Sequence, residues 1–276
     1  MYVSNQDDII MDSILATAIM AAELAGTKIK HYFHNFDSVQ IEYKGRNDFV
    51  SKVDKEAEQI IIDTILKNFP NHQINAEESG IKANNSDYKW IIDPLDGTTN
   101  FLHQFPHFAV SIGLSYKEEL RYGVIYNPIS QELFYAQKGQ GAYLNHQPIQ
   151  VSQHETLENA LVCTGFPYYK FDYLEDYMNG LNLFMQQTAG VRRPGSAALD
   201  LAYVACGRVE GYWEFNLKPW DIAAGALIVS EAGGLATDFA KGEGFLESGN
   251  ILAANPQFHQ NMHQALSSVT TRELMV

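Results

Sequence analysis

The segment Ile92–Phe101 carries the densest chemistry in the sequence. Two carboxylates, Asp93 and Asp96, follow an apolar run and precede Gly97-Thr98-Thr99, the residue types of a helix start. Carboxylate oxygens are the ligands that Mg²⁺ prefers, usually one or two protein carboxylates per ion. The exposed amides of a helix start bind phosphate oxygens. Adjacent cation and anion sites indicate metal-assisted chemistry on a phosphate ester.

Two further acidic segments could complete such a site. Glu77 and Glu78 follow a short predicted strand, and Asp221 lies in the sequence Lys218–Asp221. Each has an ordinary explanation when taken alone, because Glu-Glu-Ser is typical of a solvated turn and Asp221 of a helix start. Asp96 alone could equally cap a helix. Together, the three acidic segments favour a metal site.

Composition narrows the classes of partner. The chain has 33 acidic and 19 basic side chains, a formal net charge of −14, which argues against a nucleic-acid or anionic-membrane surface. An anionic substrate would then need bound cations to reverse the local field. Two cysteines, Cys163 and Cys206, are too few for a disulfide framework and are expected to be reduced. Acidic residues at positions 7, 8 and 12 fit no secretory signal, so we expect a cytoplasmic protein.

The elements that must position these residues follow from the hydrophobic periodicity. Helices are predicted over residues 8–33, 51–69, 174–187, 196–207, 219–232 and 256–267. Strands are predicted over 39–43, 73–76, 88–92, 109–116, 120–126, 133–137, 142–144, near 161, and over 209–214 and 251–254. Residues 44–48 read as a polar loop. Such blocks of helices and strands predict layered α+β or α/β packing.

The motifs resemble those of a known family. The string Asp93–Phe101 is similar to the signature of the inositol monophosphatase family, and residues 220–234 resemble a second signature of that family. Ala76–Ser79 and Gly195–Ala198 stand at matching places, and no ligand position departs from the pattern. The resemblance runs from about residue 18 to about residue 254. It implies an α+β chain with an αβαβα layered sandwich shared with fructose-1,6-bisphosphatases.

The same resemblance implies a domain organisation and a reaction. Residues 1–276 would form a single domain with an α+β half over 1–150 and an α/β half over 151–276. The protein would be a Mg²⁺-dependent, lithium-sensitive phosphomonoesterase, a homodimer acting on a small phosphorylated metabolite. The acidic composition and the N-terminal sequence, for their part, predict a cytoplasmic protein with no nucleic-acid or membrane partner.

The family's metal ligands carry over to matching positions. The resemblance implies that Glu77, Asp93 and the backbone carbonyl of Leu95 hold a first Mg²⁺. Asp93, Asp96 and Asp221 would hold a second, with Asp93 bridging the two ions. A third, weaker ion near Glu77 is usual in the family, so two to three ions are expected.

The resemblance also implies the remaining roles. Thr98 and Asp54 match the water-activating pair, and Glu77 is counted with them among the catalytic residues. The Gly97 and Thr98 amides would stabilise the phosphoryl oxygens. The organic half of the substrate would meet a larger set of residues, of which Arg193 and Lys218 are weaker candidates. The residues expected to bind substrate are Asp96, Gly97, Thr98, Ser196, Ala197, Glu214 and Asp221.

Three functions remain open from the sequence. The first is hydrolysis of inositol monophosphate to inositol and phosphate by direct attack of a metal-activated water. The second keeps the chemistry and changes the substrate to the 2′-phosphate of NADP, fructose-1,6-bisphosphate or a nucleotide 3′-phosphate; segments around Tyr168, Arg193 and Lys218 would decide between them. The third is a catalytically idle scaffold or regulatory protein, which is disfavoured because every ligand and activator position is filled.

Overall fold

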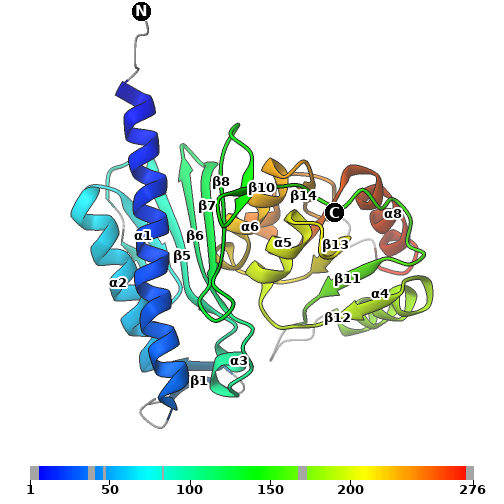
Figure 1. The fold of residues 1–276 in the computed structure, drawn as a ribbon. Coiled ribbons are helices and arrows are strands. Elements are labelled where there is room, and N and C mark those ends of the chain that lie inside the picture. Colours follow the sequence, from blue (N-terminus) through cyan, green and yellow to red (C-terminus); the bar gives the residue numbers. More distant parts are fainter. Residues whose placement is uncertain (1–5, 37–40, 46–47, 83, 167–172, 272–276) are drawn as a thin grey trace, which may run out of the picture.

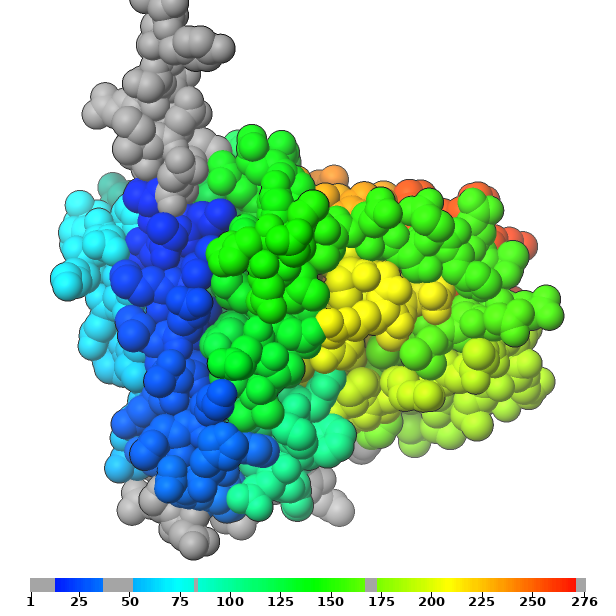
Figure 2. Space-filling model, viewed as in Figure 1, coloured from blue at the N-terminus to red at the C-terminus, as the bar shows by residue number. Residues whose placement is uncertain are grey.

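The computed structural model describes residues 6–36, 41–45, 48–82, 84–166 and 173–271 of the chain. Its helices and sheets alternate in five layers (Figure 1). Two helices form one outer layer, followed by a large sheet, a pair of central helices, a small sheet and a second outer pair of helices. The space-filling view in Figure 2 shows the same order on the surface, from the blue N-terminal helix to the lime and orange segments. The layered α+β fold expected from the sequence is therefore confirmed.

The first outer layer consists of α1 (Gln6–His34) and α2 (Lys52–Asn68). The buried face of α1 is rich in alanine, which lets the helix lie close to the sheet. A short hairpin of β1 (Ile41–Gly45) and β2 (Asp48–Ser51) joins the two helices. Among the described residues, no helix combines the length and apolarity that crossing a bilayer requires.

The large sheet has eight strands in the order β10-β9-β8-β7-β6-β5-β3-β4, and all neighbours except β3 and β5 are antiparallel. Helices cover both faces of its centre, so β6 is buried along seven consecutive residues. In chain order the strands are β3 (Gln73–Ala76), β4 (Gly80–Lys82), β5 (Tyr88–Asp96), β6 (Ala109–Tyr116), β7 (Glu119–Asn127), β8 (Glu132–Gln137), β9 (Ala142–Leu144) and β10 (Gln147–Ile149).

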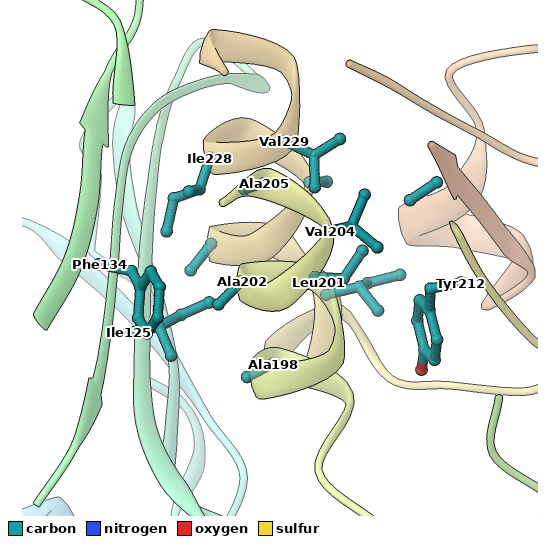
Figure 3. Close-up of a cluster of buried hydrophobic side chains, with 14 of the residues drawn as sticks. Ile125, Phe134, Ala198, Leu201, Ala202, Val204, Ala205, Tyr212, Ile228 and Val229 are labelled. Atoms are coloured by element: carbon teal, nitrogen blue, oxygen red, sulfur yellow. The ribbon is translucent and has the colours of Figure 1, made fainter. Parts of the chain in front are cut away.

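The central layer holds α5 (Ala197–Ala205) and α6 (Pro219–Glu231) between the two sheets. Eight consecutive residues of α6, Ile222–Val229, are buried, as expected for a helix with protein on every side. In Figure 3, Ile125 and Phe134 of the large sheet face Ala198 and Ala202, and Tyr212 of the small sheet lies beyond Leu201. One apolar cluster therefore joins both sheets through these helices.

The small sheet is mixed and has the order β12-β11-β13-β15-β14. Strand β11 pairs in parallel with β12 and β13, and the other pairs are antiparallel. Its strands are β11 (Leu161–Thr164), β12 (Gly190–Arg192), β13 (Gly211–Glu214), β14 (Leu235–Thr237) and β15 (Ile251–Ala254). Helices α4 (Leu174–Gln187) and α8 (Pro256–Ser267) cover its outer face, and α7 (Phe245–Ser248) precedes β15.

Most predicted elements are confirmed, several to the residue, but the polar loop over 44–48 is wrong in part. Lys44 and Gly45 end β1, and Asp48 begins β2. Arg46 lies outside the described residues. The short strands β2, β4, β10, β12 and β14 were not predicted, because segments of three or four residues rarely show a period, although the equally short β9 was predicted. The single-domain organisation stays a prediction.

Candidate active site

A bulge in β5 brings the two central carboxylates to the same face of the sheet. Asp93 lies opposite Ser111 of β6 and Asp96 lies opposite Ala109, so three residue steps on β5 match two on β6. Residues three apart in a regular strand point to opposite faces, and one extra residue restores the match. Pro94 is tolerated there because a bulge leaves a backbone position unpaired. The predicted strand over 88–92 is thus too short, since the strand continues to Asp96.

Asp93 is buried among other acids. Only 2% of the residue is exposed, and its Oδ1 accepts a hydrogen bond from the Leu95 amide (2.9 Å). Burial raises the pKa of Asp93 well above its ordinary value, and repulsion from Glu77, Asp96 and Asp221 raises it further. We call Glu77, Asp93, Asp96 and Asp221 the carboxylate cluster. Four acids that repel one another in this way suit a cation.

The cluster is followed directly by α3 (Thr98–Leu102). Gly97 turns the chain with φ of 98°, and a Cβ there would lie 3.1 Å from the His107 carbonyl oxygen, so glycine is needed. The first backbone bond of α3 runs from the Phe101 amide to Gly97 O (3.0 Å). The preceding amides have no acceptor within the helix.

Thr98 meets the residue that the family resemblance paired with it. Its hydroxyl lies 2.9 Å from Asp54 Oδ1 and 3.0 Å from the Leu95 carbonyl oxygen. A hydroxyl has one proton, so it donates to one of these acceptors at a time. Asp54 is 1% exposed and lies in the first turn of α2. The structure therefore brings together two residues that are 44 positions apart.

Helix α2 also positions the loop that carries Glu77. One turn beyond Asp54, the buried carboxylate of Glu58 accepts hydrogen bonds from the amides of Glu78 (2.8 Å) and Ser79 (2.9 Å). The Glu77 amide donates to the Ile92 carbonyl oxygen (3.1 Å), which ties the loop to β5. Glu78 thus contributes its backbone here, and Glu77 lies near enough to Asp93 to raise its pKa.

The other two acids are held by the central helices. Asp96 Oδ2 accepts from the Ser196 hydroxyl (2.6 Å) and from the Ala198 amide (2.8 Å) at the start of α5. Burial nevertheless raises the pKa of Asp96 to about 6. Asp221, in the first turn of α6, accepts from the Lys218 amide (2.7 Å). Burial and repulsion by Asp96 raise the pKa of Asp221 to about 8.

Glu214 ends β13 on the small-sheet side. Its Oε2 accepts a hydrogen bond from the Tyr212 hydroxyl (2.5 Å). Burial raises the pKa of Glu214 to about 7, although the Tyr212 bond and the nearby Arg193 guanidinium lower it. Arg193 stacks on the Phe166 ring at 4.2 Å. The Ser196 hydroxyl, expected to meet substrate, is occupied with Asp96 and with capping α5, and only 1% of Ser196 is exposed.

The donor set fits a hard divalent cation, because it consists of carboxylates and one carbonyl. Among the described residues, no three His, Cys, Asp or Glu side chains are close enough to hold an ion as they stand. The members of the cluster repel Asp93, and a cation would have to draw them together. Tyr168 lies outside the described residues.

Sequence reasoning gave no role to Glu58 or Asn100. The Asn100 side chain donates to the carbonyl oxygens of His107 (2.7 Å) and Pro194 (2.8 Å), joining α3 to the segment before α5. The helical spacing of Glu58 from Asp54 was visible in the sequence, but nothing showed that the Glu77 loop would lie beside it. Asn100 lies within the string Asp93–Phe101, but the sequence did not indicate which groups it would contact.

Comparison with known proteins gives a consistent result. The profile of the inositol monophosphatase family matches residues 10–271. Nus factor SuhB of Escherichia coli is 46% identical over 267 residues, covering 95% of this chain and 100% of that protein. The extragenic suppressor protein suhB of Bartonella henselae superposes with a TM-score of 0.89 at 41% identity, covering 92% and 98% of the two chains. The inositol monophosphatase of Anabaena superposes with a TM-score of 0.83 at 41% identity, covering 94% and 96%.

Proposed function

The chain belongs to the inositol monophosphatase family, and on that premise we propose that it is a Mg²⁺-dependent phosphomonoesterase that hydrolyses inositol monophosphate. The observation that carries this proposal is the carboxylate cluster around buried Asp93, beside the hydrogen bond from Thr98 to Asp54. The family is generally metal-dependent, and the cluster offers the donors that such dependence needs.

The cluster would hold the cations. Glu77, Asp93 and the Leu95 carbonyl would form one ligand set, and Asp93, Asp96 and Asp221 the other, as the family pattern implies. Bound divalent cations would polarise the phosphate ester, acidify the attacking water and offset the charge of the leaving oxygen.

Thr98 and Asp54 would prepare the water for attack. When the Thr98 hydroxyl donates to Asp54, its lone pairs are free to accept a proton-bearing partner such as water. Asp54 is fixed in α2 and buried, so it orients the hydroxyl without itself reaching the substrate. The amides of Gly97 and Thr98 would donate to the phosphoryl oxygens.

The small-sheet side would receive the organic half of the substrate. The Glu214 carboxylate can accept hydrogen bonds from ring hydroxyls. Ala197, which is also expected to bind substrate, lies at the start of α5. Arg193 is the one nearby cation whose attraction for Glu214 is resolved. Because Arg193 already attracts Glu214, it is poorly placed to bind a second phosphate. This favours a monophosphate over a bisphosphate or dinucleotide.

The test is phosphate release from inositol 1-phosphate, fructose-1,6-bisphosphate, a nucleotide 3′-phosphate and NADP, each with Mg²⁺ and with EDTA. We expect release from inositol 1-phosphate with the highest kcat/KM, abolished by EDTA. If another substrate has the highest kcat/KM, the proposed substrate is wrong and the proposed chemistry stands. Absence of release from all four, with Mg²⁺ binding established by calorimetry, would contradict phosphatase function.

The similarity to Nus factor SuhB of Escherichia coli supports a second candidate function, a role as a Nus factor that need not use the carboxylate cluster. Complementation of an Escherichia coli strain lacking SuhB separates the two. Rescue by wild type and by Asp93→Asn alike would support the second function, whereas rescue by wild type alone would tie the phenotype to the cluster.

A further inference from the structure

Glu214, which Asp96 of the carboxylate cluster repels, is held by one buried hydroxyl. Tyr212 is fully buried in β13, and its hydroxyl lies 2.5 Å from Glu214 Oε2. Figure 3 shows the ring of Tyr212 beside Leu201, with its hydroxyl oxygen turned away from the labelled aliphatic side chains. The aromatic body thus belongs to the apolar cluster, and only the hydroxyl reaches the site.

The Tyr212 hydroxyl is held in the donor state. Burial raises the pKa of Tyr212 well above its ordinary value, and the neighbouring acids Glu214 and Asp200 raise it further. At any pH the protein meets, the hydroxyl therefore keeps its proton. A carboxylate has only acceptors, so the proton of this bond comes from Tyr212 whenever Glu214 is ionised.

A glycine closes the other side of Glu214. Strands β11 and β13 pair in parallel with Thr164 opposite Trp213, so Gly165 runs beside Glu214. A Cβ at Gly165 would lie 1.9 Å from Glu214 Oε2 and 2.2 Å from Oε1. The carboxylate therefore lies flat against the backbone of Gly165, and no other residue type fits there without displacing it. We call Tyr212, Glu214 and Gly165 the Glu214 wall.

From these contacts we propose that Tyr212 is a positioning residue for substrate selectivity: it fixes one oxygen of Glu214 and leaves the other directed to a hydroxyl of a polyhydroxylated ring. A glutamate side chain has three rotatable bonds, and two constraints on its carboxylate spare the entropy of ordering it when substrate binds. The inference rests on the proposed function, because it assigns the determinant of ring recognition within it.

The test compares two substrates, inositol 1-phosphate and p-nitrophenyl phosphate, which has no ring hydroxyls. In Tyr212→Phe the ring and its packing stay, and only the hydroxyl is lost. We expect kcat/KM for inositol 1-phosphate to fall roughly 10-fold, mostly through KM, with kcat/KM for the aryl phosphate unchanged, as befits one hydrogen bond to a charged group.

A double-mutant cycle shows whether Tyr212 acts through Glu214. If it does, Tyr212→Phe adds no loss of selectivity in a Glu214→Gln background. Tyr32→Phe is the matched control, because Tyr32 is also buried and donates to a glutamate, Glu56 Oε2 (3.0 Å), on the outer helices. That variant should keep the selectivity of the wild type.

The outcomes separate this inference from the proposed function. Equal losses on both substrates, unchanged selectivity, or additive losses in the double variant would overturn the positioning role while leaving the phosphatase intact. Wild-type protein that releases phosphate from neither substrate, with Mg²⁺ bound, would overturn the proposed function and this inference with it.

Discussion

The carboxylate cluster and the Glu214 wall each present buried acids, but they are stabilised differently. In the cluster, Asp93 is repelled by Glu77, Asp96 and Asp221, which raises its pKa beyond the effect of burial. In the wall, burial and repulsion from Asp96 raise the pKa of Glu214, whereas the hydrogen bond from Tyr212 and attraction from Arg193 lower it. Three acids raise the pKa of Asp93, whereas a hydroxyl and a guanidinium offset part of the rise for Glu214.

This difference indicates what each side is prepared to bind. A group of acids that repel one another gains most from a multivalent cation, because burying uncompensated charge is costly. A glutamate whose one oxygen is already satisfied gains little from a cation, and its remaining acceptor suits a neutral hydroxyl. Under the proposed function, the cluster would provide reactivity and the Glu214 wall selectivity.

The largest expected effect comes from neutralising the centre of the cluster. Asp93→Asn should lower kcat/KM by more than about 10³-fold, beyond the loss from removing one electrostatic group in an active site. The loss should be the same for inositol 1-phosphate and for p-nitrophenyl phosphate. Steady-state kinetics at saturating Mg²⁺ measures it, with Asp87→Asn at an exposed position as the control. Near-normal turnover would refute the bridging role of Asp93.

A smaller effect is expected at Thr98 and Asp54, the pair proposed to activate water. Thr98→Ala should keep Mg²⁺ affinity and lower kcat by about 10²–10⁴-fold, the range for loss of general acid–base assistance. Calorimetric titration with Mg²⁺ measures the affinity, and steady-state kinetics measures kcat. Thr99→Ala is the control at the neighbouring position. If Mg²⁺ affinity falls while kcat is unchanged, Thr98 helps to bind the metal and does not activate water.

The smallest effect concerns stability and sharpens the comparison. The folded-state pKa of Glu214 is about 7, above its ordinary value of 4.5. The folded state therefore holds this proton more tightly than the unfolded state, so the contribution to stability is present below about pH 4.5 and is lost as pH rises through about 7. Between pH 4.5 and 7.5, the free energy of unfolding of Glu214→Gln should therefore fall by roughly 1–3 kcal/mol less than that of the wild type.

Denaturant unfolding in EDTA at pH 4.5, 6 and 7.5 measures the effect. Added Mg²⁺ should raise the stability of both proteins at pH 7.5 and leave the difference between them in place. Parallel pH profiles for wild type and Glu214→Gln would show that the wall does not carry this titration.

The layers of the fold were predictable because long periodic segments determine them. The buried stripe of α1 and the continuous apolar run of α6 are visible in the sequence, and the recognised string located Asp93 and Asp96. The β5 bulge was not visible, since a strand with Pro94 inside it reads as ending there. Contacts between distant segments, such as Glu58 with Ser79 or Glu214 with Gly165, depend on strand order, which local patterns do not encode.

The hydrogen bonds on Asp96 have a consequence for how the protein is made. They come from residues 100 and 102 positions further along the chain. A ribosome adds about 5–20 residues per second, so the start of α5 is synthesised roughly 5–20 s after Asp96. During that interval the growing chain already has α2, which positions Thr98 and the Glu77 loop, but it lacks α5 and the fourth acid, Asp221. A nascent chain therefore passes through a stage in which Asp96 has neither of these hydrogen-bond donors, and the carboxylate cluster is complete only late in translation.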